Sequence, residues 1–554
     1  MADFETNTQE ESCWVWGWGL CNIETAETLW DVEIGGSIES FLDRISQHDA
    51  TVYFHNLGFD GTFILDWLLK NGYSYDPDQF GRKGKFKTLI SNMGTFYSIT
   101  IRWFNGKRTE FRDSYKKLPM SVAAIAEAYG MDIAKGDLAY EVHRPRGHKP
   151  TQDERYYIGT DVLIVSKALR VQLAEGATRL TVGSDALHEY KSIIKTKAFS
   201  TKFPVLADST DREIRGAYRG GFTYVAERFK GKRLGCGKTY DVNSLYPSVM
   251  YDRLLPYGEP IYVEGAPEPN DLYPLYIANI TFTATLKPDH IPVIQVKGSH
   301  RFTATEYQTK ILDPITMMVS SVDLELWEEH YDLEIHAFDG AWMFKAETGV
   351  FSEYIDKWME VKRTSTGGKR ALAKLFLNAL YGKFATNPDI TGKYPILEDD
   401  RVKLVTGPED TRDPIYTAMG VFITAYARAI TIRAAQANYD TFAYCDTDSL
   451  HLLVTEHPDN LDIHKDKLGA WKHEYDFTEA LFVRAKTYIE KKAWRGVPFI
   501  VQHETHIAGL PVKVAKQLTM ETLVPGANFK GKLVPKRVPG GIVLHDVGFT
   551  VPVW

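Results

Sequence analysis

The chain has 554 residues, of which 44% are hydrophobic and 25% charged, with a net charge of −7. This length predicts about two to four domains with sizeable cores, and the composition excludes long disordered spans. The acidic balance excludes a protein that coats nucleic acid over its whole surface, but an enzyme with local basic grooves stays compatible. Positive charge is concentrated in residues 357–383 and 510–554.

The four cysteines form no CxxC pair, so a zinc ribbon is not expected. No apolar run approaches the roughly 18 residues of a membrane span, and no signal peptide is recognisable. We therefore expect a protein of a reducing cytoplasm that has no membrane partner.

Residues 1–180 alternate strand-like and helix-like patterns, which favours an α/β domain. Residues 51–54 predict a strand, and residues 63–69 predict a helix that ends near Asn71-Gly72. The sequence from Thr151 to Glu154 has the form of a capping box and predicts the start of a further helix.

This first region carries acids in a pattern that suits metal chemistry. Asp3 and Glu5 share one side of a predicted strand, Asp60 comes just after another strand, and Tyr157 and Asp161 are neighbours on a helix face. Four acids and a tyrosine suit a two-metal 3′–5′ exonuclease. Each piece alone is weak, because a D-x-E triplet is commonplace.

The middle of the chain adds a strand-end acid and a β-rich stretch. Asp241 lies at the end of a predicted strand, before a turn into a helix, where a side chain can point into a cleft; such an acid alone is more often structural. Residues 252–350, rich in Pro, Tyr and β-branched residues, predict an inserted β-rich module.

Residues 353–383 predict helix, and residues 370–382 carry a polar stripe. At about 100° per residue, one face holds Arg370, Lys374, Asn378 and Tyr381. The opposite face holds Leu372, Leu375, Phe376 and Ala379. The cations suit a triphosphate, and Tyr381-Gly382 offers a ring and a close backbone approach to a base. The alternative is a basic helix face in solvent.

Residues 388–418 predict a hairpin with polar tips at 398–400 and 407–410. Beyond it, residues 441–454 predict strand, tight turn and strand, with Asp446 and Asp448 at the turn. An isolated D-T-D is most often an acidic surface turn. With Asp241 the two acids suffice for two divalent cations roughly 3.5–4 Å apart, as in phosphoryl transfer. The last 40 residues predict a small β subdomain.

The motifs together resemble those of family B DNA polymerases. Three segments carry this resemblance, in the family's order: Asp241-x-x-Ser244-Leu245-Tyr246-Pro247, Lys374-x-x-x-Asn378-x-x-Tyr381-Gly382 and Tyr444-x-Asp446-Thr447-Asp448-Ser449. The whole chain resembles the φ29-type protein-primed DNA polymerases of bacteriophages. Tyr218-Arg219-Gly220-Gly221 is similar to their YxGG element, which links the nuclease and polymerase halves and binds DNA. Lys486-Thr487-Tyr488 is similar to their KxY element, which supports the primer end.

The resemblance implies roles for these residues. Asp241, the Val242 carbonyl and Asp448 would bind metal, with Asp446 as a supporting acid. Lys362 and Lys374 would hold the incoming triphosphate, with Arg370, Asn378 and Tyr381 as further nucleotide contacts. Tyr246 would lie beneath the sugar and exclude a 2′-hydroxyl. The implied cofactor is Mg²⁺, two ions per active site, with Mn²⁺ able to substitute.

The acids of the first region resemble the three motifs of proofreading nucleases. Asp3, Glu5 and Asp161 would bind metal there, Asp60 and Tyr157 would be catalytic, Lys135 would stabilise the scissile phosphate, and Asp137 is a further metal candidate. Tyr53, His55, Asn56 and Phe59 would hold single-stranded DNA by stacking and hydrogen bonds. Ordinary core packing is the alternative for Phe59. Only Met1 and Ala2 precede Asp3, whereas relatives carry about ten more residues, so we expect weakened proofreading or a start codon placed too late.

The resemblance also implies an α+β multidomain fold, with an RNase-H-like 3′–5′ exonuclease domain followed by a right-hand polymerase domain. The expected divisions are 1–180 exonuclease, 181–251 palm, 252–350 terminal-protein region 1, 351–387 fingers, 388–418 terminal-protein region 2, 419–520 palm and 521–554 thumb. In relatives the first insertion contacts the priming protein, and the second helps encircle DNA and displace the downstream strand.

The sequence therefore predicts a monomeric, protein-primed, strand-displacing replicative DNA polymerase with 3′–5′ proofreading, which copies a linear phage genome in the cytoplasm of an infected bacterium. Its expected partners are primer-template and single-stranded DNA, dNTPs and a terminal protein. Two alternatives stay open: a nuclease whose second half only binds DNA, and a non-enzymatic replication scaffold.

Overall fold

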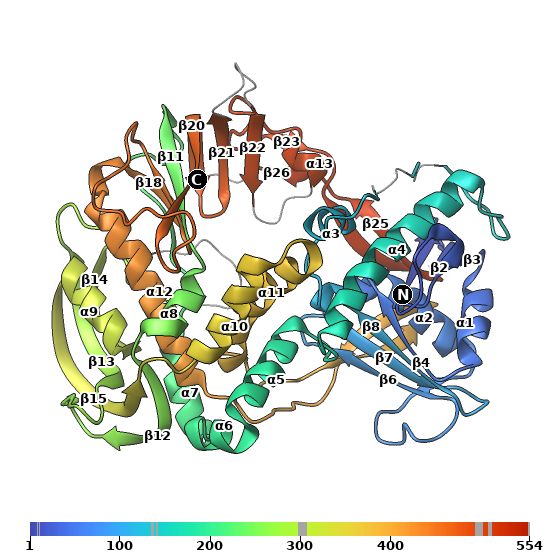
Figure 1. Cartoon of the computed structure of the whole chain (residues 1–554), viewed down its shortest axis with the longest axis horizontal. Helices are drawn as coiled ribbons and strands as arrows, with labels where there is room; N and C mark the ends of the chain where they lie inside the picture. Colours follow the sequence, from blue (N-terminus) through green and yellow to red (C-terminus); the bar gives the residue numbers. More distant parts are fainter. Residues whose placement is uncertain are drawn as a thin grey trace.

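The computed structural model describes residues 1–7, 9, 11–133, 138–139, 142–296, 307–493, 502–507 and 512–551. The N-terminal third lies on one side of the molecule, the long strands of the middle of the chain lie on the other, and the C-terminal strands reach from one to the other (Figure 1). In the described ranges, no helix combines the length and the apolar character needed to cross a membrane.

Two sheets build the N-terminal third, ordered β1-β2-β3 and β4-β8-β7-β6-β5. The strands are β1 (Ala2–Thr6), β2 (Val15–Leu20), β3 (Glu33–Gly35), β4 (Ala50–Phe54), β5 (Ser74–Tyr75), β6 (Lys85–Ile90), β7 (Phe96–Arg102) and β8 (Arg108–Asp113). The helices are α1 (Ile38–Ser46), α2 (Leu57–Lys70), α3 (Val122–Ala128) and α4 (Gln152–Ala174). The predicted α/β pattern, the strand at 51–54 and the capping box at Thr151 are confirmed. Helix α2 begins earlier than predicted, so Asp60 lies in its first turn.

The second half is organised on an eight-stranded sheet, ordered β22-β21-β20-β11-β19-β18-β9, with β10 paired to β20. Its strands are β9 (Thr223–Val225), β10 (Arg233–Leu234), β11 (Gly237–Val242), β18 (Phe442–Asp446), β19 (Ser449–Leu452), β20 (Trp471–Arg484), β21 (Thr487–Ala493) and β22 (Gln502–Ile507). Helices α8 (Leu245–Asp252) and α12 (Thr417–Ala437) belong to the same core. Helix α12 was not predicted, because it is buried almost all round and shows no amphipathic period.

The predicted β-rich module is confirmed as a four-stranded antiparallel sheet, ordered β12-β15-β13-β14. Its elements are β12 (Leu255–Val263), β13 (Leu275–Leu286), β14 (Lys310–Ser320), α9 (Ser321–His330) and β15 (Tyr331–Glu347). Alternate residues of β13 are buried, and the ring of Phe282 packs on Trp327 of α9 at 5.3 Å. The sheet therefore joins the main core through one face.

Helices lie between the two sides of the molecule (Figure 1). They are α5 (Val182–Ile194), α10 (Ser352–Thr364) and α11 (Gly367–Phe384), which confirms the helices predicted at 353–383. Helix α6 (Thr196–Lys202) contacts α5, and α7 (Asp208–Gly216) packs against β14 and α12. A Cβ at Gly368 would meet the Tyr129 ring at 2.7 Å, so the start of α11 abuts the N-terminal third.

Strands β16 (Lys393–Glu398) and β17 (Arg401–Thr406) form the predicted hairpin, with Asp399-Asp400 at its tip; the polar segment at 407–410 follows β17 instead of forming a second tip. The last elements are α13 (Val512–Ala515), β23 (Asn528–Phe529), β24 (Leu533–Val538), β25 (Gly541–Asp546) and β26 (Phe549–Thr550). β24 pairs with β25 and β23 with β26, as a small β subdomain requires.

Both late segments dock on the N-terminal third. Lys70 Nζ of α2 lies 2.8 Å from Asp400 at the hairpin tip, and Tyr75 stacks on Tyr394 at 5.4 Å. Gly540 has φ +91°, and a Cβ there would meet the Cys13 carbonyl oxygen at 2.1 Å. Only glycine permits this turn and this contact between the β24–β25 connection and the N-terminal region.

Candidate active site

The turn between β18 and β19 is fixed by its neighbours. Thr447 adopts φ +61°, which is uncommon for a β-branched residue. Its N–H donates to the Phe222 carbonyl at 2.7 Å, and its carbonyl accepts from Thr431 Oγ1 at 2.6 Å. A Cβ at Gly221 would lie 2.4 Å from Thr447 Oγ1, so this glycine is required for the close contact. The strand-turn-strand prediction is confirmed, and the turn is packed rather than free at the surface.

Asp448 lies in this turn, and Asp241 lies near the end of the adjacent strand β11. The Val242 N–H donates to the Asp448 carbonyl at 2.8 Å, and Asp241 is opposite Ser449 in the β11–β19 register. Burial, and after it the neighbouring Asp448 carboxylate, raises the pKa of Asp241 to about 7. Burial also raises the pKa of Asp448. Two acids are thus held together where ionisation of both is unfavourable.

Asp446 has a different environment from these two acids. Lys486 Nζ lies 2.7 Å from both of its carboxylate oxygens, and Thr223 Oγ1 donates to Oδ1 at 2.9 Å. The Lys486 N–H donates to the hydroxyl of Tyr444 at 2.9 Å, and the Tyr444 ring contacts Tyr488 at 4.9 Å. A lysine of the chain itself therefore neutralises Asp446, whereas the carboxylates of Asp241 and Asp448 repel each other. We call Asp241, Asp446 and Asp448 the first carboxylate site.

Cations gather beside this site at the ends of α10 and α11. Lys362 Nζ donates to Ser244 Oγ at 3.0 Å, three residues beyond Asp241. Burial lowers the pKa of Lys362, and the nearby charges of Lys374 and Arg370 lower it further. Like charges held this close favour the binding of an anion, because the anion relieves their mutual repulsion.

Helix α11 presents the predicted polar stripe. Arg370, Lys374 and Asn378 are exposed and Tyr381 is half-buried, while Leu372 and Phe376 are buried on the other side. Leu375 and Ala379, predicted on the apolar face, are only half-buried. The helix is therefore anchored by its apolar residues, and its basic residues face away from the core.

Two tyrosines form a platform next to Asp241. Tyr246 of α8 stacks on Tyr381 of α11, with ring centroids 3.9 Å apart and planes at 20°. Burial raises the pKa of Tyr218, and the neighbouring Tyr381 raises it further, which places Tyr218 in the same group. Elements that are far apart in the sequence thus meet at one stacked pair.

The segment from Tyr218 to Gly221 is held from behind. Arg428 donates to the carbonyls of Arg219 and Gly220 at 2.6 and 2.8 Å, and it forms a buried ion pair with Asp323 at 2.7 Å. Gly220 has open space where a Cβ would be, whereas Gly221 packs on Thr447. The backbone at Gly220 is therefore accessible and rigidly supported.

A second group of acids lies where β1 and β2 meet α4. Asp3 is opposite Gly19 and Glu5 opposite Gly17 in the β1–β2 register. A Cβ at Gly19 would meet Ile158 at 2.7 Å and Val162 at 2.9 Å, so this glycine permits α4 to approach the sheet closely. That approach carries the buried Tyr157 and Asp161 to the same face as the two strand acids.

Asp60 completes this second carboxylate site, which comprises Asp3, Glu5, Asp60 and Asp161. Asp60 Oδ1 accepts from the Phe4 N–H at 3.3 Å. Burial raises the pKa of Asp60 well above its usual value, and the charges of Asp3 and Asp113 raise it further. Asp113 was not predicted: it ends strand β8 and accepts from the Asn56 N–H at 3.0 Å, and an acid at a strand end was the signal that could have found it.

The predicted DNA contacts near this site differ in exposure. Asn56 is exposed with φ +74°, and Phe59 is half-buried and contacts Phe63 at 5.7 Å. Both ring nitrogens of His55 are engaged, with Ser114 Oγ at 3.1 Å and the Met120 carbonyl at 2.8 Å. Tyr53 is only 4% exposed, which argues against the predicted stacking of its ring on DNA. Lys135 and Asp137 lie outside the described residues.

The donor chemistry of the first carboxylate site fits hard divalent cations. Within the described ranges, no three His, Cys, Asp or Glu side chains form a ready-made metal cluster. Asp241, Asp448 and the Val242 carbonyl supply oxygen ligands, which Mg²⁺ and Mn²⁺ prefer. Asp448 raises the pKa of Asp241, and the pKa of Asp448 is itself raised, so a bound cation would relieve the repulsion between the two acids.

Asp241 beside a turn that carries two further acids, a cationic helix and a tyrosine platform define a site for nucleotidyl transfer, and the comparisons agree. Residues 42–157 and 143–466 match the family described as DNA polymerase type B, organellar and viral. The chain belongs to this family, which implies divalent metal cofactors, and its structure is that of a multidomain α+β polymerase.

Particular relatives are similar over their whole length. The chain is 45% identical to the DNA polymerases of Bacillus phages PZA and phi29, covering 99% of the chain and 99% and 98% of those proteins. It is 31% identical to the DNA polymerase of Streptococcus phage Cp-1, with 99% and 98% coverage. The structure resembles phi29 DNA polymerase complexed with primer-template DNA and incoming nucleotide, with a TM-score of 0.93, 44% identity and 99% of each chain covered. The likeness to the phi29 complex with single-stranded DNA has a TM-score of 0.94, the same identity and the same coverage.

Proposed function

We propose that this protein is a protein-primed, strand-displacing replicative DNA polymerase with 3′–5′ proofreading, which copies a linear phage genome. The observation that carries the proposal is the placement of Asp241, on β11, next to Asp448, in the β18–β19 turn, beside the cations of α10 and α11. Similarity over the whole chain to phage DNA polymerases supports it.

Asp241, Asp448 and the Val242 carbonyl would hold two Mg²⁺ ions. Bound there, the metal would activate the attacking hydroxyl and stabilise the leaving oxygen. Asp446 supports this arrangement without being a permanent ligand, because Lys486 already neutralises it. Lys486 and Tyr488 would then position the primer end next to the acids.

The cationic side chains would bind the triphosphate and orient it for in-line displacement. Lys362, Lys374 and Arg370 converge beside Asp241, and their mutual repulsion is relieved when a polyanion binds. The stacked Tyr246 and Tyr381 would support the sugar and base, and Tyr246 would exclude a 2′-hydroxyl. Asn378 is exposed on the same helix and would contact the nucleotide or the template.

The second carboxylate site would remove mismatched ends by hydrolysis. Asp3, Glu5 and Asp161 would hold metal, and Asp60 and Tyr157 would orient the attacking water. Exposed Asn56 and half-buried Phe59 are the best placed of the predicted residues to hold single-stranded DNA. The similar phi29 DNA polymerase forms a complex with single-stranded DNA, which supports the same substrate here.

We propose the predicted domain divisions as the functional parts of the chain. Residues 1–180 would be the exonuclease and 252–350 and 388–418 the two insertions. Residues 181–251 and 419–520 would form the palm, 351–387 the fingers and 521–554 the thumb. We propose that the hairpin β16–β17, held to α2 by Lys70, helps to encircle DNA and separate the downstream strand.

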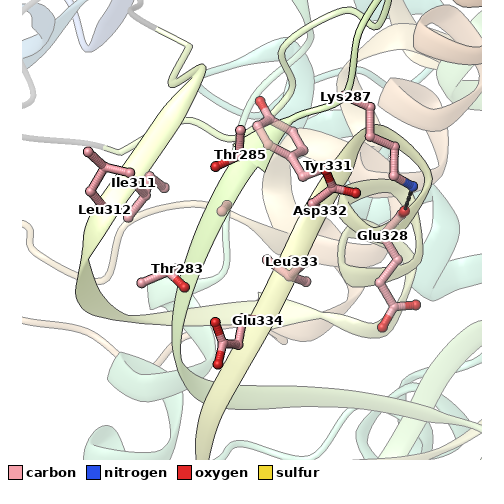
Figure 2. Close-up of a pocket in the computed structure, with 11 residues that line it drawn as sticks. Thr283, Thr285, Lys287, Ile311, Leu312, Glu328, Tyr331, Asp332, Leu333 and Glu334 are labelled. Carbon is pink, nitrogen blue, oxygen red and sulfur yellow. Dashed lines mark hydrogen bonds between the residues drawn. The ribbon is translucent and has the colours of Figure 1, made fainter.

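A terminal protein is the proposed priming partner, and the β-rich module is its proposed contact. A hollow of about 620 Å³ lies between β13, β14 and β15. Figure 2 shows its acids, Asp332 and Glu334, on β15, and Lys287 donates to the Glu328 carbonyl at 2.7 Å. Leu312 on the rim is 75% exposed. An acidic rim with exposed apolar residues suits a basic protein partner. We propose that the polymerase acts as a monomer in the cytoplasm of the infected bacterium.

Primer extension tests the polymerase and separates it from the alternatives. Wild-type protein with dNTPs and Mg²⁺ should extend a primed template, and Asp448→Asn should not, while its digestion of single-stranded DNA should stay within about twofold of wild type. Asp3→Ala should show the reverse pattern. Equal extension by wild type and Asp448→Asn would overturn the site assignment. Digestion without extension by wild type would favour a nuclease only, and neither activity would favour a scaffold.

A further inference from the structure

Strand β20 places a lysine directly beside the first carboxylate site. In the β11–β20 register, Lys472 is opposite Asp241, and Trp471 is opposite Val242. Cross-strand neighbours share a face of the sheet, with Cβ atoms roughly 4.5–5.5 Å apart. The backbone on either side is fixed, because the Asn243 N–H donates to the Ala470 carbonyl at 2.9 Å and the Gly469 N–H to the Asn243 carbonyl at 2.9 Å.

The charge of Lys472 acts both on the carboxylates of the site and on the cations beside them. It lowers the pKa of Asp241, which places it near the acids. It also lowers the pKa of Lys362, which places it near the cations that gather at α10 and α11. Lys472 therefore lies within electrostatic range of both the carboxylates and the cations of α10 and α11, which a bound polyphosphate would bridge.

The present partner of Lys472 is a weak competitor for an anion. Lys472 Nζ lies 2.7 Å from Glu474 Oε1, and the two side chains are 39% and 33% exposed. Ion pairs at this exposure contribute little, because water screens them. A side chain on a flexible four-carbon stem can leave such a pair and reach a phosphate without moving the strand.

We propose that Lys472 binds the polyphosphate of the incoming nucleotide and of the pyrophosphate that leaves, as a fourth cation beside Lys362, Arg370 and Lys374. The inference rests on the proposed polymerase function and adds a residue that no motif contains. Glu474 acts as a resting partner that releases Lys472 when the nucleotide arrives.

The test separates nucleotide binding from chemistry. A primer ending in a dideoxynucleotide forms a complex with enzyme, template and the next dNTP but cannot react. The dNTP concentration that half-saturates this complex is measured for wild type, Lys472→Gln, Lys472→Arg and Glu474→Gln. Lys230→Gln is the matched control, because Lys230 forms a comparable surface pair with Glu227 at 3.1 Å.

Lys472→Gln should raise the half-saturating dNTP concentration and the KM for dNTP about fivefold, with kcat and binding of primer-template within about twofold of wild type. The KM for pyrophosphate in the reverse reaction should rise similarly. Lys472→Arg should restore most of the affinity, Glu474→Gln should improve it about twofold, and Lys230→Gln should match wild type.

Unchanged dNTP and pyrophosphate affinity in Lys472→Gln would overturn the inference, and a loss confined to kcat would reduce Lys472 to a neighbour that only balances Asp241. In both cases wild-type extension would leave the proposed polymerase function standing. Failure of wild type to extend any primer would remove the proposed function and this inference together.

Discussion

Replacing Asp241 by Asn should stabilise the metal-free protein, because it removes a buried charge that faces Asp448. The pKa of Asp241 is raised from 3.8 to about 7 by burial and by that neighbour. At roughly 1.36 kcal/mol per pKa unit, full ionisation opposes folding by about 4 kcal/mol. The side chain is partly exposed, so solvent screening leaves about 2 kcal/mol.

The size of this stability difference increases with pH. A carboxyl group with a raised pKa binds more protons in the folded state, so its unfavourable contribution appears as pH rises above about 4 and is complete above about 7. The stability difference between Asp241→Asn and wild type should thus be small near pH 4 and reach about 2 kcal/mol at pH 8.

Thermal or urea unfolding in EDTA measures this difference in stability. Unfolding is monitored by a signal from the second half of the chain, because a protein with several domains need not unfold in one step. The melting temperature of Asp241→Asn at pH 8 should exceed that of wild type by about 2–4 °C. Adding Mg²⁺ should raise the melting temperature of wild type and leave the variant unchanged. Equal stability in EDTA at pH 8, or a difference that does not vary with pH, would refute the reasoning.

Three further predictions concern other contacts. Gly19→Val should push α4 away from the sheet, because a Cβ at this position would lie 2.7 Å from Ile158. Digestion of single-stranded DNA should fall more than tenfold, while primer extension should be kept. Equal loss of both activities would contradict this prediction. Lys70→Ala should remove the ion pair with Asp400 and weaken docking of the β16–β17 hairpin by about 1 kcal/mol. Proteolysis of the hairpin should then be faster. Primer extension through duplex DNA should slow more than extension on a single-stranded template. Glu490→Ala should lower stability by about 3 kcal/mol in urea unfolding, because it removes the buried carboxylate that lies 2.8 Å from His451 and accepts from the Tyr475 hydroxyl at 2.7 Å. Glu490→Gln should lower it by less than half as much.

The sequence by itself predicted most of the local structure around the first carboxylate site. Alternating apolar residues on both sides of Asp446 and Asp448 were enough to predict a hairpin, and the 3.6-residue period was enough to place Arg370, Lys374 and Asn378 on one face of α11. These patterns depend on neighbours in the chain, so one sequence reveals them. The same reasoning missed α12, since a helix that is buried on all sides has no polar face to mark it.

Tertiary structure decided which of these residues meet and how their charges differ. In the sequence Asp446 and Asp448 are two acids of one turn, but Lys486, forty residues away, forms its ion pair with Asp446, and Asp448 raises the pKa of Asp241 on another strand. Lys472 belongs to no motif, and only the β11–β20 register places it opposite Asp241. Charge interactions act through space rather than along the chain, so the roles of these groups were fixed only when the strands paired.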